Sequence, residues 1–101
     1  MLAFTLLLSG HAAAWDGVVS GKITGFEVTN GANYAFRVVM NGVVIMCTAG
    51  QGFAFLNESD SNYKVYVANL MMAKAQGVQV TIFSTAENGM CRIGHVGIGA
   101  A

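Results

Sequence analysis

Alternation of apolar and polar residues predicts a long first strand over residues 18–29 that bends near its middle. In the stretch VVSGKITGFEVT, Val19 and Ile23 share one face, but after Gly25 the apolar positions change phase, beginning with Phe26. A glycine at such a phase change is typical of a β-bulge, which bends a strand. A long bent strand can serve two sheets of a small barrel.

The segment NYAFRVVMNGVVIMCTA predicts a β-hairpin that turns at Asn41 and Gly42. Asn-Gly favours a type I′ turn, because both central residues of that turn need positive φ. In this register one face is apolar or small and points inward: Tyr34, Phe36, Val38, Met40, Val43, Ile45, Cys47 and Ala49. The opposite face is mixed and points outward: Ala35, Arg37, Val39, Val44, Met46 and Thr48.

An extended piece over residues 53–56 and then a helix are expected next. Three residues are candidates for the helix N-cap, namely Ser59, Asp60 and Ser61. Gly77 is the expected C-cap glycine. Apolar residues recur at helical spacing and predict a stripe that packs on the core, formed by Tyr63, Tyr66, Val67, Leu70, Met71 and Ala73.

Two more strands complete the fold. Residues 78–84 alternate as a strand, TAENG predicts a turn, and residues 90–99 form a last strand whose phase changes at Gly94. The order β-β-β-α-β-β predicts a mainly β fold with one helix, a five-stranded OB-like barrel. The alternative is an open antiparallel sheet with one packed helix. Bends in the first and last strands favour the barrel, because closure needs them there.

Residues 1–14 predict a secretory signal peptide. The apolar run over residues 2–8 is shorter than the roughly 20 residues of a membrane-spanning helix. Ala12 and Ala14 form the small-residue pattern that precedes cleavage, here before Trp15. No Lys or Arg precedes the run, which departs from the usual pattern; the alternative is a core strand of a cytosolic protein. Residues 15–101 would then form a single secreted or periplasmic domain.

The two cysteines, Cys47 and Cys91, are expected to form a disulfide in an exported domain. Closing a loop of this length is worth roughly 3–4 kcal/mol in the loop-entropy model. A metal site or catalytic thiol is the alternative. Its only support is the spacing of Cys91 and His95, which on a strand lie too far apart for one metal, so no metal is expected.

Composition and charge reduce the number of functional classes that fit this sequence. The formal net charge is zero and only 10% of residues are charged, which argues against nucleic-acid binding. The hydrophobic fraction of 54% indicates that a partner or further copies of the chain cover some apolar surface. Beyond the leader, His95 is the single candidate base at neutral pH, and no acid accompanies it in sequence. We therefore expect neither catalysis nor a cofactor.

The stretches GKITGFEV, NYAFRV, FLNESDSNYKVYVANLMMAKAQG, VTIFS and NGMCRIGHVGI resemble a group of small secreted bacterial proteins of unknown function. Residues 56–63 and 89–94 carry most of this resemblance. The element order and the cysteine in the last strand are also similar to the OB-fold binding subunits of subtilase-cytotoxin-type and pertussis-like toxins. Those subunits form five-membered rings and bind sialylated glycans. The resemblance implies a binding role, but it places no sugar-contacting residue on this sequence.

OB barrels bind ligands on their second and third strands and adjoining loops. The expected binding residues are accordingly on or beside the outward face of the predicted hairpin: Arg37, Val39 and Met46 on that face, and Tyr34 near the start of the strand. One arginine beside apolar side chains suits a protein surface, or a glycan carboxylate held by Arg37. The predicted function is thus a secreted or periplasmic, non-enzymatic module that binds a protein or glycan and forms homo-oligomers. The alternative is a structural, self-assembling protein in which the same residues pack against a neighbouring subunit.

Overall fold

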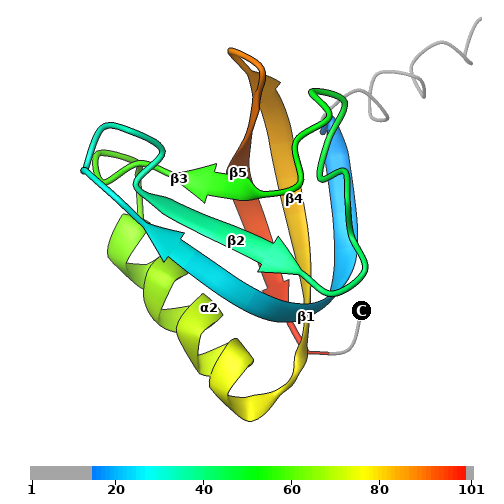
Figure 1. The fold of residues 1–101 in the computed structure, drawn as a ribbon. Coiled ribbons are helices and arrows are strands. Elements are labelled where there is room, and N and C mark those ends of the chain that lie inside the picture. The colour runs from blue at the N-terminus through cyan, green and yellow to red at the C-terminus, as the bar shows by residue number, and fades with distance from the viewer. Residues whose placement is uncertain (1–14, 100–101) are drawn as a thin grey trace, which may run out of the picture.

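The computed structural model describes residues 15–99, and its five strands form a closed ring (Figure 1). The predicted signal peptide, residues 1–14, lies outside the described residues. The elements are β1 (Gly17–Val28), β2 (Phe36–Met40), β3 (Ala54–Leu56), α2 (Tyr63–Gln76), β4 (Gln79–Glu87) and β5 (Met90–Ile98). Neighbouring strands follow the order β1-β2-β3-β5-β4, and β4 pairs with β1 to complete the ring.

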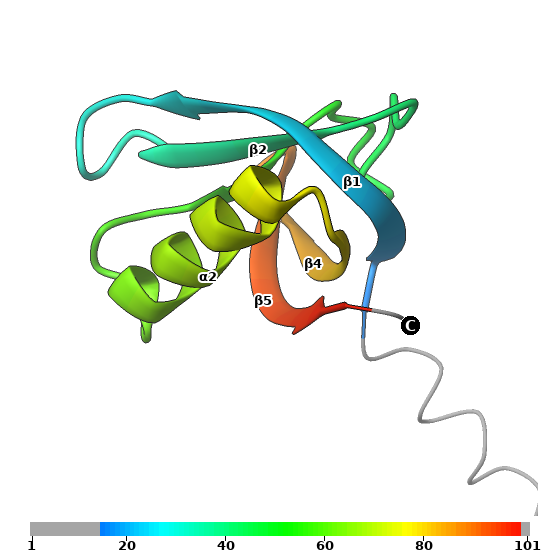
Figure 2. The same cartoon turned by 90° about the horizontal axis from the view of Figure 1, so that it is seen from below.

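This arrangement confirms the predicted mainly β, OB-like order with one helix. Only β3 and β5 run parallel; every other pair in the ring is antiparallel. Helix α2 contacts β1, β4 and β5 at one end of the ring, which Figure 2 shows from below. No helix among residues 15–99 has the length and apolar character needed to cross a bilayer.

Both predicted strand bends are confirmed. The register between β1 and β2 shifts between Ile23 and Gly25, so β1 pairs with β4 in its first half and with β2 in its second. In β5, the register shift leaves Gly94 without a partner between His95, opposite Phe83, and the next pair. The irregularity in β1 lies where this strand passes from β4 to β2, and the one in β5 lies just beyond its pairing with β3.

The predicted hairpin after β2 is wrong. Residues 41–53 form a loop, and β2 pairs instead with β3, with Phe36 opposite Leu56. A turn does form, because the amide of Val43 donates to the carbonyl of Met40 at 3.2 Å. Gly42 has φ of 73°, but Asn41 does not have positive φ, so the turn is not type I′.

Contacts elsewhere in the ring explain why the loop does not return along β2. Met46 and Cys47 are 1% and 4% exposed, so this part of the loop is buried in the core. The amide of Thr48 donates to the carbonyl of Asp16 at 3.2 Å, next to the start of β1. Ile45, predicted to point inward, is 58% exposed, because strict alternation does not hold in a loop.

The start of the helix also differs from the prediction. Asn62 is the N-cap residue, with φ of 62° and no capping side-chain hydrogen bond, so Ser59, Asp60 and Ser61 are not caps. Asp60 instead accepts a hydrogen bond from the amide of Asn57 at 2.7 Å. The C-cap prediction is confirmed, because Gly77 has φ of 67° and its amide bonds to the last turn.

The core fills the ring and the space under α2. Leu70 and Ala73 are the fully buried helix residues, whereas Met71, predicted to pack on the core, is 52% exposed. The remaining buried core comes mainly from alternate positions of the strands and from the loop: Ile23, Phe36, Val38, Met40, Met46, Cys47, Ala54, Leu56, Val80, Ile82, Cys91 and Ile93.

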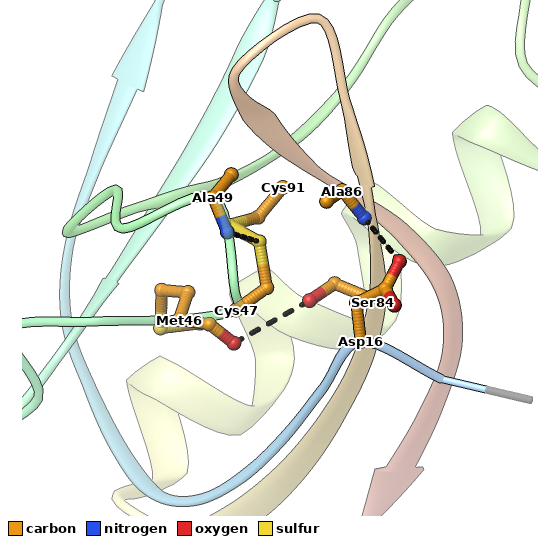
Figure 3. Close-up of a disulfide and its surroundings, with 7 residues drawn as sticks. All are labelled: Asp16, Met46, Cys47, Ala49, Ser84, Ala86 and Cys91. Atoms are coloured by element: carbon orange, nitrogen blue, oxygen red, sulfur yellow. Dashed lines mark hydrogen bonds between the residues drawn. A yellow bond between two sulfur atoms is a disulfide. The ribbon is translucent and has the colours of Figure 1, made fainter. Parts of the chain in front are cut away.

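The predicted disulfide between Cys47 and Cys91 is confirmed (Figure 3). It joins the loop after β2 to the start of β5, across a sequence separation of 44 residues. Next to it, the buried Ser84 hydroxyl donates to the carbonyl of Met46 at 3.5 Å. The Asp16 carboxylate accepts from the amide of Ala86 at 2.8 Å, which holds the entry to β1 against β4.

Candidate binding site

The structure brings together two of the four residues predicted to bind a ligand. The Nε of Arg37 donates to the carbonyl of Tyr34 at 3.1 Å, and Nη2 donates to the carbonyl of Asn33 at 3.4 Å. Nη1 of Arg37 lies 3.7 Å from the carboxylate of Glu27. The guanidinium of Arg37 is therefore engaged within the chain, which weakens the case for a glycan carboxylate at this position.

The other two residues do not join this pair. Val39 lies opposite Gly25 on the neighbouring strand and is half-buried. Met46 is 1% exposed, so the prediction that it faces outward is wrong. The cause is the loop after β2, which turns Met46 into the core where a strand would have turned it out.

Across the outer face of the ring, Arg37, Phe55 and Arg92 are direct neighbours on β2, β3 and β5. The guanidinium carbon of Arg92 lies 5.2 Å from the centre of the Phe55 ring, and Tyr34 meets the same ring edge-on at 4.6 Å. Phe55 is only 1% exposed although it is on the outside of the ring. The side chains of the predicted binding face therefore contact one another, and packing within the chain accounts for their arrangement.

Arg92 also connects three segments through ion pairs. It forms two hydrogen bonds with the Glu87 carboxylate, at 2.6 and 3.2 Å, and a further pair with Asp60. The hydrogen bonds from Arg92 lower the pKa of Glu87 below its ordinary value of 4.5. The same bonds, together with the charge of Asp60, raise the pKa of Arg92 in spite of its partial burial.

A hollow of about 200 Å³ lies elsewhere, between α2 and the second half of β5. We call it the α2–β5 groove, and its lining consists of Asn62, Val65, Tyr66, Asn69, His95, Val96 and Ile98. None of these residues was predicted as a binding residue. The signal in the sequence was the spacing of positions 62, 66 and 69, which places two carboxamides and the hydroxyl of Tyr66 on one side of a helix.

The groove has a defined chemistry. The Tyr66 hydroxyl donates to the carbonyl of Gly94 at 3.0 Å and ties the helix to β5 at its irregular point. Two carboxamides and one imidazole supply further donors and acceptors, and three aliphatic side chains supply apolar surface. The lining contains no Asp, Glu, Lys or Arg, so the groove suits an uncharged ligand.

An aromatic cluster supports one wall of the groove. Phe83 meets the ring of His95 edge-on at 4.8 Å, and Trp15 lies 5.6 Å from Phe83 and 6.3 Å from His95. His95 is opposite Phe83 in the β4–β5 ladder, so register and ring contacts together place its imidazole. His95 on the last strand thus lines the groove, and its ring packs against Phe83 and Trp15.

A second hollow, of about 300 Å³, lies between the start of β1 and the loop after β2. Its lining consists of residues 16–19 and 45–48. Val18 and Ile45 in this lining are 56% and 58% exposed, and nearby in sequence Val44 is 78% exposed. This apolar surface is suited to contact with another protein surface.

Among residues 15–99, no three histidine, cysteine or acidic side chains gather closely enough to hold a metal ion. Comparison with protein-family models and with curated protein sequences finds no match to this chain.

Proposed function

We propose that this protein is an exported, non-enzymatic binding module that takes its ligand, a protein or a glycan, in the α2–β5 groove. One observation carries the proposal: a hollow lined by Asn62, Asn69, the Tyr66 hydroxyl and His95, with no Asp, Glu, Lys or Arg in its lining. Carboxamides do not ionise near neutral pH, but they donate and accept hydrogen bonds. Such groups recognise hydroxyl or amide groups of a ligand, and the one imidazole in the lining, that of His95, has no acidic partner there for acid–base chemistry.

Export is supported by the disulfide and by the predicted leader. Disulfides persist in the periplasm and outside the cell, and they are rare in the reducing cytosol. The Cys47–Cys91 bond closes a long loop inside a small domain, which is how small exported domains supplement a limited core.

The proposal is tested by screening the purified protein on an array of neutral and sialylated glycans and against a displayed peptide library. We expect Asn69→Ala to weaken any ligand found by about tenfold, which corresponds to roughly 1.4 kcal/mol. Met71→Ala is the matched control, because Met71 is on the same helix, 52% exposed, and outside the groove lining. Equal binding by both variants, or no ligand in either screen, contradicts the proposal.

Self-assembly is the second candidate function, favoured by the exposed Val18, Val44 and Ile45 around the second hollow. Light scattering of the purified protein tests it. Open-ended polymers that disappear in Ile45→Lys would support it, and a monomer would rule it out. A discrete ring of copies would instead support a binding role like that of the toxin subunits.

A further inference from the structure

The second half of β5 has a strand neighbour on one side only. β3 pairs with β5 at Cys91 and Arg92, and within residues 15–99 no strand pairs with this side of β5 beyond Arg92. The other side of β5 pairs with β4 as far as Ile98. The free edge of β5 therefore forms one wall of the α2–β5 groove, with Val96 and Ile98 in the lining.

The direction of the backbone groups on this edge follows from the ladder. The amide of Gly99 donates to the carbonyl of Gln79 at 2.7 Å, and the pairing continues without a shift to His95. Hydrogen-bonded pairs alternate along an antiparallel ladder, so Gly97 and His95 bond toward β4. The N–H and C=O groups of Val96 and Ile98 consequently point away from β4.

A contact of the helix confirms this direction. The carbonyl of Gly94 accepts the hydrogen bond from Tyr66, so it points toward α2. Positions 96 and 98 follow at steps of two residues and share that direction, because backbone groups alternate along a strand. Apart from the strand ladders, no hydrogen bond among residues 15–99 uses the backbone of Val96 or Ile98.

The two walls are similar in length. Asn62 and Asn69 are seven residues apart on the helix side, which spans about 10 Å at 1.5 Å per residue. Residues 95–98 span about 10 Å in an extended strand. A length of this order accommodates about three residues of an extended chain.

We propose that the occupant of the α2–β5 groove is an extended, uncharged peptide segment that adds as a further strand to the edge of β5. Its backbone bonds to Val96 and Ile98, the amides of Asn62 and Asn69 bond to its opposite edge, and its side chains contact Val65 and Ile98. This inference rests on the proposed function, since it names the ligand class for the same groove. The uncharged lining is complementary to an uncharged segment.

The regular spacing of the free backbone N–H and C=O groups on the β5 side of the groove favours a peptide over a sugar as the ligand. The free groups of β5 recur at every second residue, about 6.6 Å apart, which is the repeat of an extended peptide's own N–H and C=O groups. Sugar hydroxyls do not repeat at this spacing along a line. When a peptide adds as a strand, its backbone hydrogen bonds usually provide the affinity, and contacts of its side chains with the groove provide the sequence preference.

The test starts from a phage library of random seven-residue peptides, from which the best binder is synthesised with blocked ends. Amide hydrogen exchange is then followed by NMR on the purified protein with and without this peptide. We expect exchange at Val96 and Ile98 to slow by tenfold or more, while Gly97, which already bonds to β4, changes little. Unchanged exchange at Val96 and Ile98 would overturn the proposal.

Methylation of the peptide backbone separates strand addition from side-chain binding. N-methyl groups on the alternating residues that bond to β5 should weaken binding by about tenfold or more, and methyl groups on the residues that face α2 should weaken it less, because that edge meets side-chain amides and not a strand. Val65→Arg, in the groove, should weaken binding, whereas Met71→Arg, on the same helix outside the lining, should not. Equal effects of the two methylated peptides, or of the two variants, would contradict strand addition.

The remaining outcomes separate this inference from the proposed function. If a glycan shifts the NMR signals of Asn62 and Asn69 and no peptide binds, the binding module stands and the peptide inference fails. If neither ligand perturbs the groove, both fail. If exchange at Val96 and Ile98 slows with protein concentration alone, the occupant is a second copy of the chain and the peptide inference is overturned.

Discussion

The indole ring of Trp15 lies against the backbone of Gly94, so closely that a methyl group at position 94 would come within 2.6 Å of the ring carbon Cζ3. Gly94 thus has two roles. It is the unpaired residue where β5 shifts its register against β4. Because it lacks a side chain, it also leaves room for the Trp15 ring, which packs with Phe83 and His95. The phase change visible in the sequence predicted the first role and not the second.

Gly94→Ala should displace the Trp15 ring. Trp15 is the single tryptophan, so its fluorescence reports the change directly, and we expect emission to shift to longer wavelength as the ring becomes more exposed. Crowding of this kind costs about 1–3 kcal/mol, and the low end is expected because the half-buried ring can move. Gly97→Ala is the control, since a Cβ there meets no atom within 4 Å. Identical emission from both variants would contradict this account.

The turn between β4 and β5 should be sensitive at its glycine. Asn88 and Gly89 have φ of 53° and 78°, and Glu87 pairs with Met90, so this is the two-residue turn with both central residues at positive φ. Gly89→Ala should lower the free energy of unfolding by about 1–2 kcal/mol, measured by urea denaturation. Asn88→Gly should be tolerated within about 1 kcal/mol. A neutral Gly89→Ala would show that the turn relaxes to another type.

In the loop after β2, we expect contrasting effects on stability from two apolar side chains that are two residues apart, Val44 and Met46. Met46→Ala should destabilise the fold by about 2–5 kcal/mol, because Met46 is 1% exposed in the core. Val44→Ala should change stability by less than about 0.5 kcal/mol, because Val44 is 78% exposed. Thermal unfolding of the two variants measures the contrast. In the predicted hairpin both side chains would have faced outward, so similar small effects would favour that register.

Removal of the disulfide should lower stability by about 4 kcal/mol in the loop-entropy model, given its separation of 44 residues. The double variant Cys47→Ala with Cys91→Ala tests this by chemical denaturation. Reductant should destabilise the wild type by a similar amount and leave the double variant unchanged. An effect of reductant on the double variant would mean that the loss arises elsewhere.

The ion pair of Glu87 and Arg92 should contribute a small, pH-dependent stability. Because hydrogen bonds from Arg92 lower the pKa of Glu87, the ionised carboxylate is favoured in the folded state. The contribution is therefore present above the ordinary pKa of 4.5 and is lost as pH falls through the lowered value. The side chain of Glu87 is 45% exposed, and solvent screens the pair, so the difference in the free energy of unfolding between wild type and Glu87→Gln should be at most about 1 kcal/mol near neutral pH.

This difference should shrink toward zero in acid, measured as the free energy of unfolding by urea at several pH values. Glu27→Gln is a useful comparison, because its contact with Arg37 is longer, at 3.7 Å, and Glu27 is 65% exposed. A Glu87→Gln difference that grows as pH falls would have the wrong sign and would contradict the assigned pairing.

Two of the three Asn-Gly pairs show that the local sequence does not suffice to predict which strands form a hairpin. Asn41–Gly42 and Asn88–Gly89 carry the same turn signal, yet only the second closes a hairpin between adjacent strands. After the first, the chain is drawn away by the burial of Met46 and by the bond from Cys47 to β5, which are contacts between distant segments. A pair of turn residues sets a local bend, but it does not choose the strand that follows.

The candidate binding site likewise has one part that the local sequence predicts and one part that depends on tertiary contacts. Tyr34 and Arg37 are three residues apart, so their proximity could be expected from the sequence. The α2–β5 groove lies between a helix and a strand that are not consecutive elements, and the bond from Tyr66 to Gly94 joins residues 28 apart in the sequence. No local pattern places those two walls together, because their contact depends on how α2 packs against the closed ring.

By itself, the sequence determined the order of five strands and one helix, the two strand bends, the C-cap and the cysteine pair. These depend on alternation, on glycine and on composition, which act over a few residues or through a simple count. Tertiary structure alone decided the partner of β2, the burial of Met46, the internal pairing of Arg37 and the groove beside β5. Those features arise where segments far apart in the chain compete for the same neighbours, and the competition is settled by packing and backbone pairing across the whole ring.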